Sequence, residues 1–239
     1  MGMAAYYRSQ QLEIIHLKDW QITYHEHNHV SIYTIGFVLA GAVTLICEEQ
    51  AVAVQPGHFF IIKPYQMHAL LLPSVYNMIA VCLPKELMEQ HNANSLREIL
   101  SQNIARLDLS IKATCLETAV GALYQGEPPL SLDGDLLASV KHLRLNPENN
   151  STIQNMADSM YFSKYYYIKR FKQKLGMTPH QFQLQNKVRK AQRMLENGKP
   201  LTVIAADLGF YDQSHFIKCF KQIIGLTPAV YRQAVSRLP

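Results

Sequence analysis

Histidines are the side chains of this sequence with the most evident chemistry. His25, His27 and His29 occupy alternate positions, and His68 follows within the same half of the chain. Alternate side chains of a β-strand point to one face, so the first three are predicted to share a face. Imidazole nitrogens ligate divalent metals and also take part in hydrogen bonds. The pattern leaves four alternatives open: a ligand pocket, a barrel wall, a metal site or a catalytic centre.

Basic side chains form the second chemical group, and they gather in one half of the chain. The 239 residues carry a net charge of +5. Residues 1–134 hold 7 Lys and Arg against 12 Asp and Glu, whereas residues 135–239 hold 16 against 6. Such a basic half is typical of a polyanion binder. The alternative is a solvated basic surface without a partner.

Composition excludes several other classes of protein. Hydrophobic residues make up 48% and charged residues 17%, which is typical of a globular protein. No apolar run reaches the roughly 18 residues of a membrane span, and the first residues lack the apolar core of a signal peptide. We therefore expect a cytoplasmic protein without a membrane partner. Four widely spaced cysteines without a CxxC pair predict reduced thiols.

Short β-strands are predicted to position the histidines. Between Leu12 and Leu83, apolar and β-branched runs alternate with turn signals such as Pro56-Gly57. Many short strands at this spacing indicate a barrel or jelly roll. The expected strands cover residues 22–29, 32–39, 43–47, 51–54, 59–62 and 75–83.

Two blocks in this region resemble cupin motifs. In HNHVSIYTIGFVLAGA, His27 and His29 take the paired-histidine positions and Gly41 takes the closing glycine. His68, in PYQMHAL, matches the histidine of the second motif. Tyr33 and its neighbour Thr34 stand where cupin enzymes carry a glutamate ligand, which disfavours an enzyme.

The resemblance implies a cupin-like, effector-sensing barrel over residues 1–84. We predict that its effector-binding residues are His25, His27, His29, Tyr33 and His68. Tyr24, Phe37 and Tyr65 are further candidates for the lining. If the site holds a divalent metal as cofactor, the candidate ligands are His27, His29 and His68.

A helical segment is predicted over residues 85–125. Pro84 is well placed to start a helix, and Leu100, Ile104, Leu107 and Ile111 recur at helical spacing. The apolar stripe either packs on the barrel or pairs subunits, and we expect a homodimer. Residues 126–134 follow, with two prolines and two glycines, and they predict a linker at the point where the charge reverses.

The segment 201–231 predicts a helix-turn-helix. A first helix, capped by Thr202, is expected to end at Gly209, and a second is expected over residues 213–224. Two phenylalanines four residues apart share one face of the second helix, so they can pack onto the first. In such a motif the second helix enters the major groove of DNA.

Many positions of this segment match the signature of AraC/XylS-type transcription regulators. The residues that carry the resemblance are Ile204-Ala205, Gly209-Phe210, Ser214-His215-Phe216, Phe220-Lys221, Gly225, Thr227-Pro228 and Tyr231-Arg232. The resemblance implies a non-enzymatic regulator of transcription, more often an activator than a repressor, with RNA polymerase as a further partner.

The segment has a second copy upstream. Residues 163–182 match residues 212–231 at an offset of 49, and the turn of the second copy is one residue longer than that of the first. A helix from Pro179 to about Asn197 connects the two copies. Its length, roughly 28 Å at 1.5 Å per residue, approaches the roughly 34 Å between successive major-groove faces.

Helix geometry and the resemblance nominate the same DNA-facing residues. They lie opposite the apolar faces of the two second helices, and lysine, glutamine and isoleucine can contact guanine, adenine and a thymine methyl. The alternative for each residue is that it lies on a solvated helix face and does not contact DNA. The predicted DNA-binding residues are Lys164, Tyr165, Ile168, Lys169, Lys172, Gln213, Ser214, Ile217, Lys218 and Lys221, with Lys172 and Lys221 assigned to phosphates.

Together these patterns predict an α+β protein of two domains. A cupin-like β barrel with dimerisation helices precedes an all-α domain, at residues 135–239, with two helix-turn-helix units joined by a long helix. The predicted function is effector-controlled, sequence-specific binding of double-stranded promoter DNA. The alternatives are a metal-dependent cupin enzyme or metal sensor fused to a DNA-binding domain, and an architectural DNA binder with an inert barrel.

Overall fold

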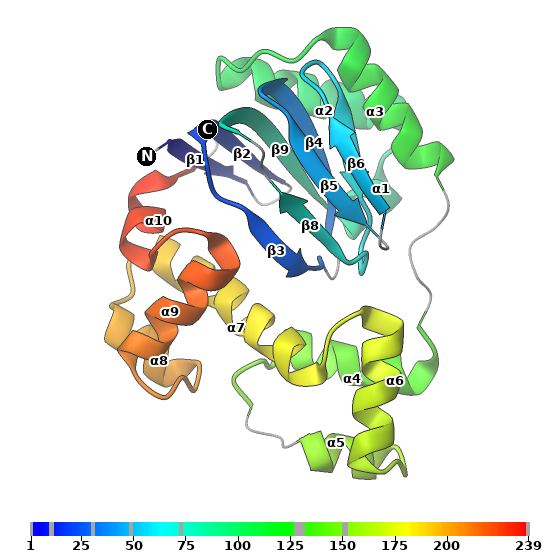
Figure 1. Ribbon diagram of the computed structural model, residues 1–239, viewed down its shortest axis with the longest axis vertical. Coiled ribbons are helices and arrows are strands. Elements are labelled where there is room, and N and C mark those ends of the chain that lie inside the picture. The colour runs from blue at the N-terminus through cyan, green and yellow to red at the C-terminus, as the bar shows by residue number, and fades with distance from the viewer. Residues whose placement is uncertain are drawn as a thin grey trace. The chain divides into compact units, whose positions relative to one another are not determined.

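The computed structural model describes residues 2–9, 12–29, 32–47, 50–71, 74–126, 132–149 and 153–237. The chain forms two compact units, one of residues 1–130 with 234–239 and one of residues 131–233. The first unit is rich in β-strands, and the second is helical (Figure 1).

The first unit contains two β-sheets. Their strands, in chain order, are β1 Met3–Arg8, β2 Glu13–Trp20, β3 Tyr24–His27, β4 Ile32–Ala40, β5 Val43–Cys47, β6 Gln50–Val54, β7 Phe59–Ile62, β8 His68–Leu71, β9 Tyr76–Pro84 and β10 Val235–Arg237. The six-stranded sheet has the order β10-β1-β2-β9-β4-β7, and the four-stranded sheet has the order β3-β8-β5-β6. All described pairs are antiparallel except β1 with β10.

Strand β4 has a buried face on each side of the six-stranded sheet. Ile35 and Phe37 are buried in the core that this sheet forms with the neighbouring helices. Thr34 points the other way, where its hydroxyl lies 3.8 Å from the Cys82 thiol of β9. A strand buried on both faces needs apolar residues at nearly every position, as the IYTIGFVLA sequence of β4 provides.

Three helices cover one face of the six-stranded sheet: α1 Lys85–Gln90, α2 Ala93–Arg106 and α3 Ala113–Gln125. Leu100 and Ile104 of α2 pack in one core with Ile35 of β4, and Leu107 and Ile111 lie at its margin. The predicted apolar stripe is therefore used within the protomer, against the sheet.

The second unit consists of seven helices among the described residues. They are α4 Gly134–Leu145, α5 Ile153–Ser159, α6 Lys164–Leu175, α7 Pro179–Glu196, α8 Leu201–Asp207, α9 Gln213–Ile224 and α10 Pro228–Ala234. Thr152, which precedes α5 in the sequence, lies outside the described residues.

The long helix α7 is fixed at its start by a capping box. Gln181 N donates to Thr178 Oγ1 at 3.3 Å, and Thr178 N donates to Gln181 Oε1 at 2.9 Å. Pro179 follows at the first helical position, where its lack of an N–H costs nothing. Phe182, buried near this end, stacks edge-on against Phe171 of α6 at 5.5 Å between ring centroids.

The C-terminal end of α7 is fixed by contacts with helices α9 and α10. Tyr231 of α10 donates from its hydroxyl to Glu196 at 2.8 Å, and its ring lies 5.4 Å from that of Phe220 in α9. Helices α6 and α9 are thus joined to the two ends of α7, as Figure 1 shows in yellow-green and orange.

Two local predictions are wrong. Thr202 does not cap α8, because the helix begins one residue earlier, at Leu201, with Pro200 as its N-cap. The predicted strand over residues 22–29 is shorter, from Tyr24 to His27. Strand β1 was not predicted: it forms by pairing with β2, where Tyr6 lies opposite Ile15.

Cys47, Cys82, Cys115 and Cys219 form no disulfide in this structure. Within the part of the chain that the structure describes, no helix combines the length and the apolar character that crossing a bilayer requires.

Candidate functional site

The first helix-turn-helix is built on a compact aromatic core. Ser163 caps α6 by accepting a hydrogen bond from Tyr166 N at 3.2 Å, and Gly176 ends the helix with a left-handed φ of 75°. Tyr167 and Phe171 are buried, and the Tyr167 hydroxyl pairs with Ser139 of α4 at 2.5 Å. These contacts turn the opposite face of α6 outward.

The second helix-turn-helix repeats the same plan. Asp212 caps α9 by accepting from His215 N at 2.7 Å, and Gly225 ends the helix with φ of 83°. Phe216 and Phe220 are fully buried, with ring centroids 5.7 Å apart. The helix presents its other face to solvent, as α6 does.

The predicted DNA-binding residues all lie on these outward faces. Ile168 and Ile217 are half-buried at the edge of each face, and the other eight side chains are exposed. Those eight are Lys164, Tyr165, Lys169, Lys172, Gln213, Ser214, Lys218 and Lys221.

Arg170 is the basic residue of α6 that the protein uses internally. Its Nη2 donates to Asp133 Oδ2 at 2.8 Å, and its guanidinium lies over the Phe162 ring at 5.1 Å. The hydrogen bond from Arg170 lowers the pKa of the Asp133 carboxyl. Because Asp133 also caps α4 through Leu136 N, this pair fixes α6 against α4.

Two turn residues were not nominated from the sequence. Tyr161 is 98% exposed and Tyr211 is 92% exposed, each beside the start of an outward-facing helix. Tyr161 adopts a left-handed φ of 57°, as Gly209 does with 63°, so the two occupy equivalent turn positions. Tyr211 lines an open depression of about 450 Å³ with Asp212, Ser214, His215 and Lys218. The signal available in the sequence was the bulky aromatic residue at each of these turns.

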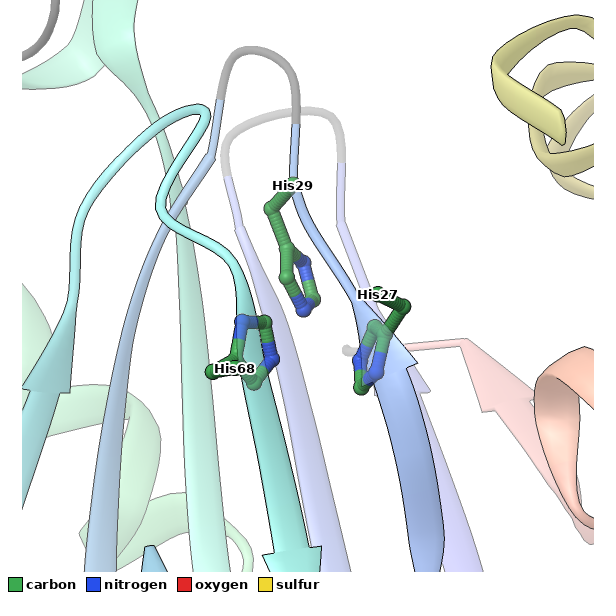
Figure 2. Close-up of side chains that lie close together, drawn as sticks. All are labelled: His27, His29 and His68. Carbon is green, nitrogen blue, oxygen red and sulfur yellow. The ribbon is translucent and has the colours of Figure 1, made fainter. Parts of the chain in front are cut away.

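Three histidines come together in the β-rich unit. The ligand atoms of His27, His29 and His68 all lie within 4.8 Å of one another. The ring centroid of His68 lies 4.1 Å from that of His27 and 5.0 Å from that of His29. Figure 2 shows the three rings converging, two from β3 and the segment after it, and one from the start of β8.

Backbone carbonyls fix the orientation of two of these rings. His27 Nδ1 lies 2.7 Å from the carbonyl oxygen of His25, and His68 Nδ1 lies 3.0 Å from that of Gln66. A carbonyl only accepts, so each Nδ1 carries the proton and donates it. The lone pair of each neutral ring is then on Nε2.

Two family models match the two halves of the chain. One, described as an AraC-like ligand binding domain, matches residues 9–98, and the other, described as a helix-turn-helix domain, matches residues 156–234. The chain is an AraC-family transcription regulator. Its β-rich unit carries the ligand-binding domain for a small-molecule effector, and its helical unit carries the DNA-binding domain.

Known proteins resemble this regulator in sequence and in fold. It is 26% identical to the uncharacterised HTH-type transcriptional regulator YobQ of Bacillus subtilis (strain 168), over 78% of this chain and 79% of that protein. An apo variant of ToxT from Vibrio cholerae has a TM-score of 0.65 at 13% identity, covering 96% of this chain and 100% of that one. ToxT with a bound unsaturated fatty acid has a TM-score of 0.60 at 14% identity, covering 95% and 97%.

Two predicted effector residues lie away from the histidine cluster. His25 is exposed and does not share a face with His27, because a bulge between Tyr24 and His27 inserts an extra residue and breaks the alternation on which the prediction relied. Tyr33 lies on the helix-covered side of β4, packed at the margin of the core with Ile35. Burial raises the pKa of its hydroxyl, on which Lys85 and Glu89 of α1 also act.

Tyrosine side chains extend the polar region of this AraC-type barrel beyond the histidines. The bulge aligns Tyr24 with His27, and their ring centroids lie 6.4 Å apart. Burial raises the pKa of Tyr24 to about 12, so its hydroxyl stays protonated at neutral pH. Tyr76 is 1% exposed, and its hydroxyl has no hydrogen-bond partner among the described residues. No sequence pattern singled out Tyr76, because it begins an apolar strand.

Proposed function

We propose that this AraC-family regulator reads two segments of a promoter at once, with α6 in one major groove and α9 in the next. The observation that carries the proposal is the pair of outward faces, held at the two ends of one capped helix of 18 residues. An α-helix of that length spans roughly 27 Å. Two heads on such a rod can meet successive grooves on one side of bent DNA.

The ten predicted DNA-binding residues would make two kinds of contact. Residues in the first two turns of each helix, such as Lys169 and Gln213, would contact base edges. Lys172 and Lys221, nearer the helix ends, would contact phosphates and set the register. Hydroxyl-radical footprinting of the purified protein on its own upstream region is the test. Two protected segments about one helical turn apart are expected, and one short segment would contradict a paired reading.

The effector is proposed to bind in the β-rich unit, beside His27, His29 and His68. Tyr24 and Tyr76 supply further hydroxyls in the same region. ToxT has been solved with a bound unsaturated fatty acid, which is a carboxylate, and we propose by analogy that the effector of this chain carries an anionic group. Binding would change DNA affinity only through contacts that differ between two states of the protein.

We further propose a division of the chain into residues 1–84 for sensing, 85–125 for pairing of subunits, 126–134 as linker and 135–239 for DNA. The proposed homodimer, the contact with RNA polymerase and activation of transcription rest on the AraC/XylS resemblance. Since the apolar stripe of α2 faces the sheet, pairing would use the outer surfaces of α2 and α3. A pure monomer in sedimentation at micromolar concentration would contradict the dimer.

The regulator is proposed to act on DNA in the cytoplasm and to release its effector unchanged. Incubation of the full chain with candidate ligands, followed by analysis of the recovered ligand, tests the second point. Recovery of a converted product that depends on His27 or His68 would instead favour a cupin-type enzyme.

A further inference from the structure

We propose that His27, His29 and His68 bind one divalent first-row transition-metal ion, and that this ion keeps a coordination position open for an anionic donor group of the effector. The inference rests on the proposed function in one respect only, namely that the effector binds in the β-rich unit. The metal site itself stands on the geometry of the three side chains.

The spacing of the ligand atoms fits such an ion. Zinc–nitrogen bonds of 2.0–2.1 Å place two nitrogens of a tetrahedron about 3.4 Å apart. In this structure the three ligand atoms already lie within 4.8 Å of one another. His27 and His29 are half-buried, so small side-chain rotations can close the remaining distance without moving the strands.

The backbone prepares two of the ligands. The carbonyls of His25 and Gln66 accept from Nδ1 of His27 and His68, which makes Nε2 the nitrogen of each ring that can ligate a metal. Metal-bound histidines characteristically donate their second nitrogen to such an outer acceptor, which fixes the tautomer and raises the basicity of the ligand. This arrangement exists in the protein before any ion is bound.

The strand register keeps the ligands together. His27 of β3 lies opposite His68 of β8, and His68 in turn lies opposite Cys47 of β5. Directly opposite residues of antiparallel strands point to the same face. The bulge in β3 puts His27 into this row. Without it, the pairing of Tyr24 with Leu70 would place Glu26 opposite His68, and His27 would point to the other face.

The charge of the metal site determines which group of the effector can bind to the ion. The cluster consists of three imidazoles, which are neutral ligands when they bind a metal, with no carboxylate within it among the residues that the structure describes. A bound divalent ion would keep its full charge of about +2, and bound cations of this kind dominate the local electrostatics. An open position on such an ion favours a carboxylate or another oxyanion.

A second observation indicates a ligand in the same region. The Tyr76 hydroxyl is buried and has no hydrogen-bond partner within the described ranges, although burying an unpaired hydroxyl is unfavourable. Tyr76 lies opposite Trp20, and its hydroxyl is close enough to Tyr24 for the two to interact electrostatically; the Tyr24 ring neighbours His27. An effector anchored on the ion can extend toward these hydroxyls and satisfy them.

The test uses the full-length protein, freed of metal with a chelator and titrated with Zn²⁺ or Co²⁺. We expect one ion per chain by calorimetry and elemental analysis, and an affinity loss of at least tenfold in His27→Ala and in His29→Ala. His25→Ala is the matched control, because His25 is exposed on the same strand and outside the cluster, and it should bind the ion as the natural protein does.

His68 is 2% exposed, so His68→Ala is interpreted only if circular dichroism shows the native fold. The two half-buried histidines keep the test decisive if that variant does not fold. Absence of stoichiometric binding, or equal binding in His27→Ala and His25→Ala, overturns the metal site. If promoter footprints persist in that case, the proposed DNA-reading function stands and only this inference fails.

The open position has its own readout. Azide added to the Co²⁺-loaded protein should shift the visible absorption of the bound ion, since azide is a small anionic donor. Cys47→Ser should leave both the metal and the azide response intact. An unchanged spectrum would show that the site is closed. Loss of the ion in Cys47→Ser would show that the thiolate is its fourth ligand. Either result would overturn the role of the ion in holding the effector.

Discussion

Lys169 and Lys172 offer the sharpest test of how α6 meets DNA. Both side chains are exposed, and neither belongs to an ion pair among the described residues. Lys169 lies in the middle of the helix, whereas Lys172 lies in its last turn. Replacing either with alanine should leave the fold intact, so a change in binding reports on DNA contact alone.

Lys169→Ala is expected to reduce discrimination between the natural site and a site with one altered base pair. A lost base contact of this kind costs about 1–3 kcal/mol, which corresponds to roughly 5- to 140-fold at about 1.4 kcal/mol per tenfold change. Lys172→Ala should weaken binding to both sites alike and lower the slope of log affinity against log salt by about 1.

Fluorescence anisotropy with a labelled promoter fragment, at three or more salt concentrations, measures both quantities. Thermal melting of each variant checks that the fold is unchanged. An equal loss on both DNA sites in Lys169→Ala would refute the base contact and reassign Lys169 to a phosphate. Altered base preference in Lys172→Ala would refute the assignment of the two lysines together.

The other predictions concern stability. Asp212→Ala should lower the free energy of unfolding by about 1 kcal/mol in urea titrations, because the N-cap of α9 is lost; an unchanged midpoint would contradict the cap. Gly176→Ala should destabilise by about 1–2 kcal/mol, since φ is 75°, while Gly121→Ala, in open space within α3, should be neutral or stabilising. Asp133 has a lowered pKa beside Arg170, so its contribution is present above the ordinary carboxyl pKa of about 3.9 and is lost as pH falls through the folded-state pKa. The stability difference between the natural protein and Asp133→Asn should therefore shrink on acidification, and a difference independent of pH would contradict the pair.

The helical unit was largely predictable because its signals are local. Ser163 and Asp212 are N-caps, Gly176 and Gly225 adopt the left-handed conformation that ends a helix, and the repeat aligns the two copies. The prediction that Thr202 caps α8 was wrong because a threonine near a helix start is a capping candidate whether or not the helix begins one residue earlier.

The β-rich unit was less predictable because its contacts are non-local. His27, His29 and His68 were found through spacing and resemblance, but the bulge that separates the face of His27 from that of His25 depends on the pairing of β3 with β8. Tyr33 was misplaced for a different reason. In a strand that is apolar on both faces, no alternation reveals which side faces the interior of the sheets.

Helix α7 has a consequence for the promoter itself. A spacer that is capped at one end and fixed at the other by Tyr231 cannot lengthen or rotate freely, unlike a flexible tether. Inserting about five base pairs between the two contacted segments would turn one of them to the far side of the duplex, and a full turn of about 10.5 would move it beyond reach. The regulator then recognises the distance between the two DNA segments as well as their base sequence.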